Sequence, residues 1–166
     1  MEIERKFLMD PAFPAELSLR EEAVVYQGYL AVHPVVRIRS KCRDGKTGYV
    51  LCFKGEGTIA RQETELVIDE RVFHELENLL EAPMIRKDYR VYDLPEGRRL
   101  ECSCVDRGTP TEFWYAEVEF PTLEDAYAFT PPAFLGRDVT EEAGYGMSSY
   151  WERKVAAQRA ASEDNA

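Results

Sequence analysis

Hydrophobic and polar residues alternate in short segments along most of this chain, and turn residues separate the segments. Eight segments show the alternation: 2–9, 23–31, 35–43, 48–54, 60–68, 85–93, 98–105 and 112–120. Asp44-Gly45 is typical of a tight hairpin turn between two of them. Most connections are too short for parallel crossovers, so the pattern predicts a mainly β (α+β) fold with an antiparallel sheet.

Three helices are expected outside the strands. In the first, the apolar stripe consists of Val72, Phe73, Leu76, Leu79 and Leu80. Asp69 is the expected cap of this helix. Thr122 and Asp125 resemble a capping box that opens a short helix through Phe129. A last helix is expected to begin near Ser148, with Ser148-Ser149 as its cap.

The chain shows no internal repeat and no linker, so residues 1–155 are expected to form one domain. Residues 156–166 are small and polar, and we expect a frayed or disordered tail there.

Charged residues fall on one face of nearly every predicted strand, because successive side chains point to opposite faces. In the first strand Glu2, Glu4 and Lys6 share a face. The later strands contribute Arg37, Arg39, Lys41, Lys54, Arg61, Glu63, Glu65, Lys87, Arg99, Glu101, Glu117 and Glu119. A single strand of this kind is typical of a sheet with one wet face. Like charges two residues apart repel each other, so their recurrence favours a bound ion of opposite sign between them.

The two kinds of charge suit two kinds of ligand. Paired carboxylates suit a hard divalent cation, and paired arginines and lysines suit phosphate oxygens. Both sets inside one barrel predict a site for a metal–polyphosphate complex. Eight strands enclose an interior wide enough for one small ligand.

Composition excludes several other classes of protein. The 166 residues carry 31 acidic and 21 basic side chains, which argues against a nucleic-acid surface. No apolar run has the length of a membrane span, and the charged start is unlike a signal peptide. The cytoplasm is therefore the expected location. The four cysteines match no common zinc spacing and are expected to be buried, reduced thiols.

The charged motifs also follow one another in a distinctive order. They are Glu2-Ile3-Glu4-Arg5-Lys6, Gln27-Gly28-Tyr29-Leu30, Val36-Arg37-Ile38-Arg39, Phe53-Lys54-Gly55, Arg61-Gln62-Glu63-Thr64-Glu65, Ile85-Arg86-Lys87, Ala116-Glu117-Val118-Glu119 and Leu135-Gly136-Arg137-Asp138-Val139-Thr140. Over residues 2–150 this order resembles the CYTH superfamily, also called the triphosphate tunnel metalloenzymes, and most closely its short bacterial branch.

The resemblance implies a closed eight-stranded antiparallel barrel, a tunnel, that acts on a triphosphate with Mg²⁺ or Mn²⁺. It implies metal ligands at Glu2, Glu4, Glu117 and Glu119, with Glu63 and Glu65 either helping to hold a second metal or ordering the basic groups. It implies phosphate contacts from Lys6, Arg37, Arg39, Lys54, Arg61 and Lys87. Glu2 or Glu4 would orient the attacking water. Lys6 lies near the reacting end, and its glutamate neighbours are expected to raise its pKa, which favours phosphate binding over a role as base.

Three positions differ from the family's usual pattern. Tyr89 stands two residues beyond Lys87, where the family usually has arginine, and alternation points the following Arg90 out of the tunnel. Ser103 stands where an acid is usual, and Met147 where the short branch often has asparagine.

Three functions remain open on this basis. The first is metal-dependent hydrolysis of inorganic triphosphate or another triphosphate, by water attack on the terminal phosphoryl group. The second is a class IV-type adenylate cyclase. The third is a non-catalytic polyphosphate- or nucleotide-binding module, which Tyr89 and Ser103 favour. The expected partner is a small-molecule triphosphate, and both a monomer and a homodimer are open.

Overall fold

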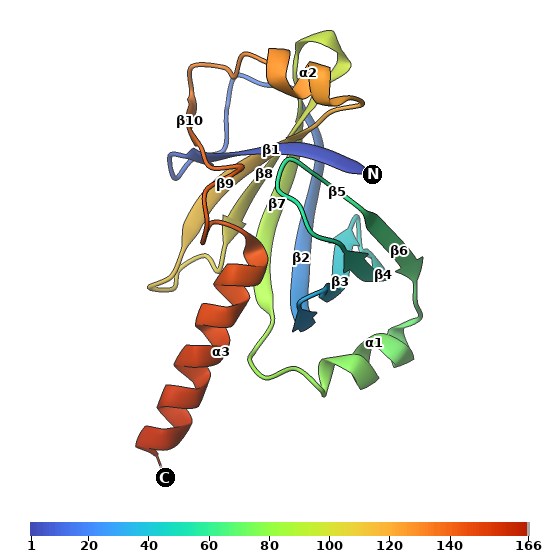
Figure 1. Ribbon diagram of the computed structural model, residues 1–166, viewed down its shortest axis with the longest axis vertical. Coiled ribbons are helices and arrows are strands. Elements are labelled where there is room, and N and C mark those ends of the chain that lie inside the picture. The colour runs from blue at the N-terminus through green and yellow to red at the C-terminus, as the bar shows by residue number, and fades with distance from the viewer. Residues whose placement is uncertain (166) are drawn as a thin grey trace.

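The computed structural model describes residues 1–165, and its strands form one antiparallel sheet that curls into a nearly closed barrel (Figure 1). The strands are β1 (Glu2–Met9), β2 (Leu19–Val32), β3 (Val35–Arg43), β4 (Lys46–Lys54), β5 (Ala60–Arg61), β6 (Glu63–Val67), β7 (Ile85–Asp93), β8 (Arg99–Val105), β9 (Phe113–Glu119) and β10 (Leu135–Asp138). Their order is β10-β1-β9-β8-β7-β2-β3-β4-β6, and β5 pairs with β1. The antiparallel sheet predicted from alternation and the barrel implied by the family resemblance are both confirmed.

The barrel closes through the segment predicted as one strand over 60–68. The structure divides it at Gln62 into β5 and β6. Strand β6 pairs with β4, whereas β5 pairs with β1 through only two register pairs, Glu2 with Arg61 and Ile3 with Ala60. This segment therefore links β4 to the first strand by a short seam.

Strand β10 is additional to the eight strands that we predicted. It pairs with β1 at Phe7 and Met9. Its approach is close, because a Cβ at Gly136 would lie 2.8 Å from the Leu8 carbonyl oxygen. The strand has four residues, which is too short for alternation to reveal it.

The first two helices begin where their caps predicted. They are α1 (Glu70–Glu77) and α2 (Leu123–Ala128), and a 3₁₀ turn, η1, spans Pro95–Gly97. The Asp69 side chain accepts a hydrogen bond from the Val72 amide, and the Thr122 side chain accepts one from the Asp125 amide. Helix α1 ends before Leu79, which is exposed, so the apolar stripe continues beyond the helix.

The last helix differs from the prediction at both ends. Helix α3 (Met147–Asp164) has Gly146 as its N-cap, so Ser148 and Ser149 lie inside the first turn and are not the cap that we expected. The helix also continues through residues 156–164, where we expected a frayed or disordered tail. This stretch contains four alanines, the strongest helix formers, and it extends away from the barrel (Figure 1). Ala166 lies outside the described residues.

Two hydrophobic clusters support the barrel. One consists of residues from α3, the adjoining barrel wall and the α1–β7 connection, namely Tyr29, Val35, Ala82, Ile85, Val105, Tyr115, Met147, Tyr150, Trp151 and Val155. The other covers the outer faces of β1, β8 and β9 beneath α2. Cys52, Cys102 and Cys104 are buried free thiols, whereas Cys42 is exposed, contrary to the prediction, because it lies near the β3–β4 hairpin.

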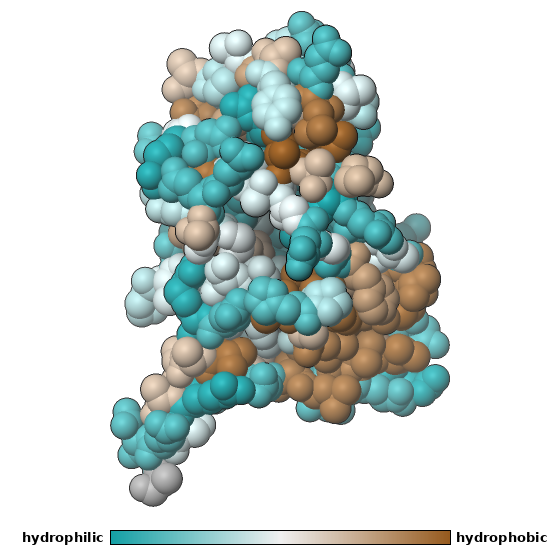
Figure 2. All heavy atoms as spheres, viewed as in Figure 1, coloured by the Kyte–Doolittle hydropathy of each residue, from teal (hydrophilic) through white to brown (hydrophobic). Residues whose placement is uncertain are grey.

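The surface carries apolar residues beside α1 and β6, where Leu66, Val67 and Leu79 are exposed (Figure 2). Within residues 1–165, every helix is too short or too polar to cross a bilayer.

Candidate active site

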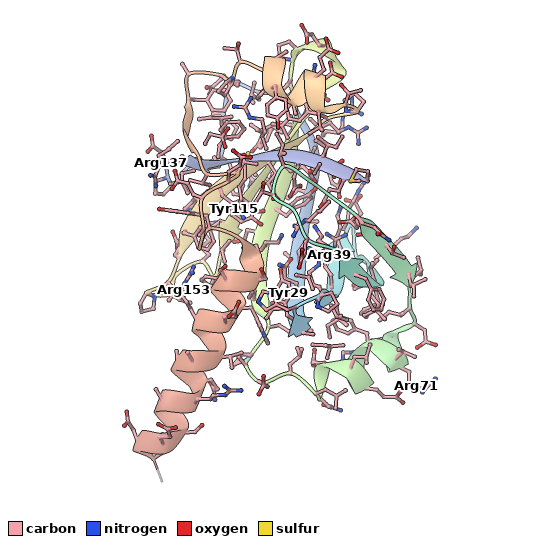
Figure 3. All side chains as sticks on the ribbon, in the orientation of Figure 1. Tyr29, Arg39, Arg71, Tyr115, Arg137 and Arg153 are labelled. Atoms are coloured by element: carbon pink, nitrogen blue, oxygen red, sulfur yellow. The ribbon has the colours of Figure 1, made fainter. Side chains whose placement is uncertain are left out.

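The barrel encloses a cavity of about 480 Å³, and the predicted site residues meet there. The lining includes all twelve of them: Glu2, Glu4, Lys6, Arg37, Arg39, Lys54, Arg61, Glu63, Glu65, Lys87, Glu117 and Glu119. Tyr29, Arg39 and Tyr115 lie within the barrel, whereas Arg71, Arg137 and Arg153 lie at its periphery (Figure 3). The charged interior is therefore a structural fact, and the role of each residue in it stays a prediction.

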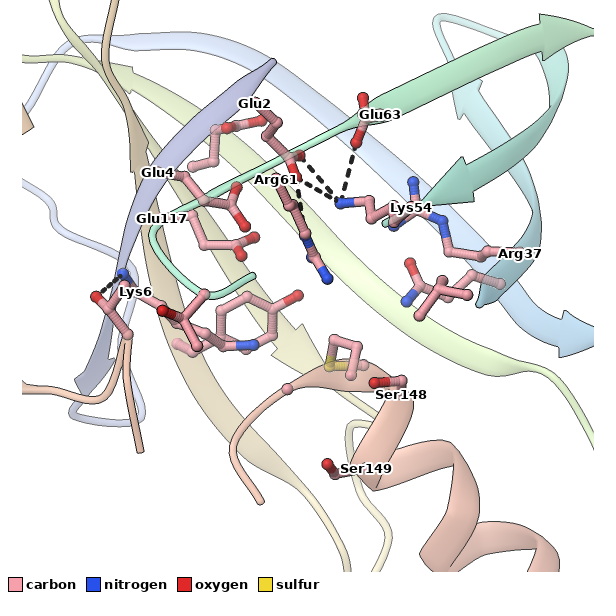
Figure 4. Close-up of a pocket in the computed structure, with 18 of the residues that line it drawn as sticks. Glu2, Glu4, Lys6, Arg37, Lys54, Arg61, Glu63, Glu117, Ser148 and Ser149 are labelled. Atoms are coloured by element: carbon pink, nitrogen blue, oxygen red, sulfur yellow. Dashed lines mark hydrogen bonds and ion pairs between the residues drawn. The ribbon is translucent and has the colours of Figure 1, made fainter. Parts of the chain in front are cut away.

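Lys54 joins the acidic groups of two strands (Figure 4). Its Nζ lies 3.0 Å from both carboxylate oxygens of Glu2 and 3.0 Å from Glu63 Oε2. Arg61 Nε donates to Glu2 at 3.2 Å. These contacts follow from the register, in which Lys54 is opposite Glu63 and Arg61 is opposite Glu2. Opposite charges on facing strands therefore form the wall of the cavity.

Two arginines of β3 face Glu65. The nearest nitrogens of Arg37 and Arg39 lie 3.9 and 3.5 Å from Glu65 Oε1. Arg37 is buried, and its Nε has no hydrogen-bond partner among residues 1–165. An unpaired guanidinium donor inside a protein suits an anionic oxygen.

The carboxylates of β1 and β9 crowd together. Oxygens of Glu2, Glu4 and Glu119 all lie within 4.8 Å of one another. Burial, together with the charges of Glu117 and Glu2, raises the pKa of Glu4 to about 9. Glu4 therefore holds a proton at neutral pH in the metal-free protein. A crowded set of carboxylate oxygens suits a hard divalent cation.

Two of the lysines that line the cavity, Lys6 and Lys87, are buried. Burial lowers the pKa of Lys6, so our expectation of a raised pKa was wrong: loss of solvation outweighs the attraction of Glu117 and Glu4. Burial also lowers the pKa of Lys87 to about 7, against the attraction of Glu117. Phosphate oxygens at these lysines would favour their charged forms.

The departures at positions 89 and 103 are one structural feature. Tyr89 and Ser103 lie directly opposite each other on β7 and β8. The Tyr89 hydroxyl donates a hydrogen bond to Glu101. Relative to the family's arginine and acid, the pair removes one positive and one negative charge, so it leaves the charge balance of the interior unchanged.

Arg90 lies outside the barrel, as alternation predicted. Its guanidinium lies 4.4 Å from the centre of the Phe13 ring, and its Nε is 3.3 Å from a carboxylate oxygen of Glu22. It therefore does not replace the missing arginine at Tyr89.

Several residues of the cavity were not in the predicted set. Tyr115 shares the inward face of β9 with Glu117, so alternation contained the signal for it. Lys41 also lines the cavity and pairs with Glu21. The segment 139–149, including the first turn of α3, lines the cavity too, and its irregular sequence gives no periodic signal.

Comparison with known proteins identifies the group to which the chain belongs. No family model matches the chain. An inorganic triphosphatase from Nitrosomonas europaea is 35% identical over 144 residues, which are 87% of this chain and 92% of that protein. A crystal structure of an inorganic triphosphatase superposes with a TM-score of 0.63 and 31% identity, over 90% of this chain and 93% of the other.

More distant structures share the fold alone. A Hippeastrum protein, named as an adenylyl cyclase with a dominant triphosphatase activity, has a TM-score of 0.54 at 18% identity, over 76% of this chain and 83% of its own. A Pyrococcus horikoshii protein has a TM-score of 0.56 at 17% identity, over 95% and 90%. From the identity to the Nitrosomonas protein, the tunnel fold and the order of the charged motifs, we conclude that the chain belongs to the CYTH superfamily.

Proposed function

We propose that the protein is a metal-dependent hydrolase of inorganic triphosphate. One observation carries the proposal: a cluster of carboxylate oxygens and a row of buried and half-buried cations share one cavity of the barrel. The similarity to an inorganic triphosphatase supports the same substrate.

The charge balance of the cavity supports a metal–triphosphate complex as the ligand. The acidic lining residues are Glu2, Glu4, Glu63, Glu65, Glu101, Glu117, Glu119 and Glu142; the basic ones are Lys6, Arg37, Arg39, Lys41, Lys54, Arg61 and Lys87. The carboxylates would repel a polyanion that bound alone, and the lysines and arginines would repel a cation that bound alone. A complex of the two places each charge beside its opposite.

The acidic cluster is the proposed metal site. Glu2, Glu4 and Glu119 would hold Mg²⁺ or Mn²⁺ together with Glu117, and Glu63 and Glu65 would serve a second ion. A bound divalent cation supplies charge neutralisation and lowers the pKa of coordinated water. The crowding that keeps a proton on Glu4 supports this assignment, because a cation can take the place of that proton.

The cations are the proposed phosphate site. Lys6, Arg37, Arg39, Lys54, Arg61 and Lys87 would hold phosphate oxygens. In phosphoryl transfer, positioning and stabilisation of charge on the equatorial oxygens supply most of the catalysis. We assign the orientation of the attacking water to Glu2 or Glu4, which lie beside these cations.

The two alternatives have less support. The triphosphatase similarity favours hydrolysis over cyclase chemistry, and the Hippeastrum protein named as a cyclase has a dominant triphosphatase activity. A non-catalytic module was favoured by Tyr89 and Ser103, but these face each other and leave the charge balance unchanged. The cytoplasmic location and the choice between monomer and homodimer stay predictions.

The direct test is incubation of the purified protein with inorganic triphosphate or ATP, with Mg²⁺, Mn²⁺ or excess chelator. We expect phosphate release from triphosphate only with metal. Cyclic AMP from ATP would favour the cyclase, and tight binding without turnover would favour the module. Arg37→Ala is expected to lower kcat/KM about 100-fold, as for loss of a preorganised charge partner. Arg90→Ala is the matched control, because Arg90 lies outside the barrel.

A further inference from the structure

Tyr115 contacts two lysines of the cavity in two different ways. Lys6 Nζ lies 3.9 Å from the centre of the Tyr115 ring, over its face. Lys87 Nζ donates a hydrogen bond of 3.1 Å to the Tyr115 hydroxyl oxygen. Lys87 is farther from the ring centre, at 5.8 Å, so the hydroxyl is its main contact. The Tyr115 ring therefore contacts Lys6, and the Tyr115 hydroxyl contacts Lys87.

The barrel register brings these three side chains together. Tyr115 lies on β9 two residues before Glu117, and Glu117 is directly opposite Lys6 on β1. Lys87 lies on β7, which β8 separates from β9. The β8 residue directly opposite Tyr115 is Ser103, whose side chain is short. A tyrosine at this position therefore reaches lysines on both sides of β9.

Burial makes these contacts important for the lysines. Tyr115 is 1% exposed, Lys6 8% and Lys87 6%, so little water reaches either ammonium group. The face of an aromatic ring attracts a cation, and a phenol oxygen accepts a hydrogen bond from one. A buried tyrosine has only two side-chain torsions, and close packing fixes both. Each ammonium group is thus held against a rigid support.

We propose that Tyr115 is a positioning residue that fixes the separation and direction of Lys6 and Lys87, the first through its ring face and the second through its hydroxyl. The proposal deepens the proposed function and rests on it, because it assumes that both lysines contact phosphate. Tyr115 itself acts only through the lysines.

The two contacts can be removed separately. Tyr115→Phe keeps the ring beneath Lys6 and removes the partner of Lys87. Tyr115→Leu removes both. We expect Tyr115→Phe to lower kcat/KM for triphosphate about tenfold, the order expected for a hydrogen bond to a charged group.

A double-mutant cycle separates positioning from a general structural effect. Lys87→Met removes the group on which the hydroxyl acts, so in that background Tyr115→Phe is expected to have little further effect on kcat/KM. A merely structural role would lower kcat/KM by the same factor in both backgrounds, and that result would overturn the proposal for Lys87.

A second measurement does not depend on activity. In the metal-free and substrate-free protein, the ring current of Tyr115 should shift the NMR signals of the Lys6 ε-methylene protons upfield. Lys6→Met and Lys87→Met assign the two signals. We expect Tyr115→Phe to keep the Lys6 shift and move only the Lys87 signal, and Tyr115→Leu to abolish the Lys6 shift. A Lys6 signal without an upfield shift in the natural sequence would overturn the proposal for Lys6, even if Tyr115→Leu does not fold.

Tyr92→Phe is the matched control. Tyr92 is also buried, and it belongs to the hydrophobic cluster on the outside of the barrel. This substitution should leave both lysine signals and kcat/KM unchanged. If the NMR pattern holds but triphosphate is not hydrolysed, the proposed function fails and the positioning of the lysines stands. If hydrolysis holds but the cycle is additive and the shift is absent, the positioning role fails alone.

Discussion

Lys54 Nζ lies 3.0 Å from both carboxylate oxygens of Glu2, and this ion pair connects β4 to β1 across the interior of the barrel. Both side chains are largely buried, at 7% and 10% exposure. Neither charge has much access to water, so each depends on its partners in the cavity. The pair therefore places a cation of the proposed phosphate site beside a ligand of the proposed metal site.

Lys54→Met is expected to lower kcat/KM for triphosphate about 100-fold, because it removes one preorganised phosphate contact. Arg61 stays beside Glu2, so the fold should persist. Initial rates of phosphate release with Mg²⁺ measure the effect. Lys46→Met, at the exposed start of β4, is the control and should leave the rate unchanged. Equal rates of phosphate release for the two variants would show that Lys54 does not contribute to the proposed phosphate site.

Lys87 should make the stability of the ligand-free protein depend on pH. Burial lowers its pKa from 10.5 to about 7, so between these values the unfolded chain binds more protons than the native protein. The free energy of unfolding contributed by Lys87 therefore rises as the pH rises from about 7 to 10.5. Lys87→Met should stabilise the protein more at pH 6 than at pH 9. Urea unfolding of both proteins at these pH values tests the sign, and a pH-independent difference would contradict it.

Glu4 should make the stability of the metal-free protein depend on pH with the opposite sign to Lys87. Its pKa is raised to about 9, so the native metal-free protein holds a proton that the unfolded chain loses near pH 4.5. The contribution of Glu4 to stability is therefore complete below about pH 4.5 and is lost as the pH rises towards 9.

At pH 8 we expect Glu4→Gln to raise the Tm of the metal-free protein and to reduce the increase in Tm that Mn²⁺ causes. Thermal unfolding with Mn²⁺ and with chelator measures both effects. Glu152→Gln, on the exposed side of α3, is the control. An unchanged Mn²⁺ response in Glu4→Gln would place the metal elsewhere.

Asp106 should anchor α3 to the barrel. Its carboxylate accepts hydrogen bonds from the Tyr150 hydroxyl, from Lys154 Nζ at 2.9 Å and from the Arg86 amide at 2.9 Å. Asp106→Ala removes three hydrogen bonds at one buried carboxylate, although the Tyr150 hydroxyl keeps Thr111 and Lys154 keeps the Met84 carbonyl as partners. We expect it to cost about 3 kcal/mol in the free energy of unfolding, at about 1 kcal/mol for each bond lost. Glu81→Ala breaks only the exposed pair with Arg159 and should cost less than about 0.5 kcal/mol. Urea unfolding compares the two, and equal costs would refute the anchor.

Substitutions at Tyr89 and Ser103 should have coupled effects on stability. Because they are directly opposite each other, Tyr89→Arg and Ser103→Asp together create a cross-strand ion pair. Ser103→Asp alone places an unpaired carboxylate near Glu101, so we expect the double variant to be more stable than this single variant. A thermal-unfolding cycle over the four proteins measures the coupling, and additive changes in stability would argue against a shared site.

Alternation predicted the antiparallel strands and their charged faces because a strand exposes every second residue to the same face, and the family resemblance implied that the sheet closes into a barrel. Glu2, Glu4, Arg37, Arg39 and Glu117 could therefore be assigned to one side before any tertiary structure was known. Three features depend on tertiary context and did not follow from the pattern. Strand β10 is too short to show a period, and the segment 139–149 reaches the cavity through an irregular path.

The pKa of Lys6 was the third such feature. The sequence places glutamates beside Lys6, which suggested a raised pKa. The barrel then buries the lysine almost completely, and loss of solvation has the larger effect. Nearest neighbours along a strand therefore predict the partners of a charge better than its solvation.

The short seam between β5 and β1 gives Glu2 two tasks. Its backbone forms one of the two register pairs that close the barrel, and its side chain belongs to the acidic cluster. A divalent ion bound to the Glu2 carboxylate would therefore contact the same residue whose backbone pairs β1 with β5. Amide hydrogen exchange at Ala60 and Arg61 thus becomes a readout of whether the interior is loaded.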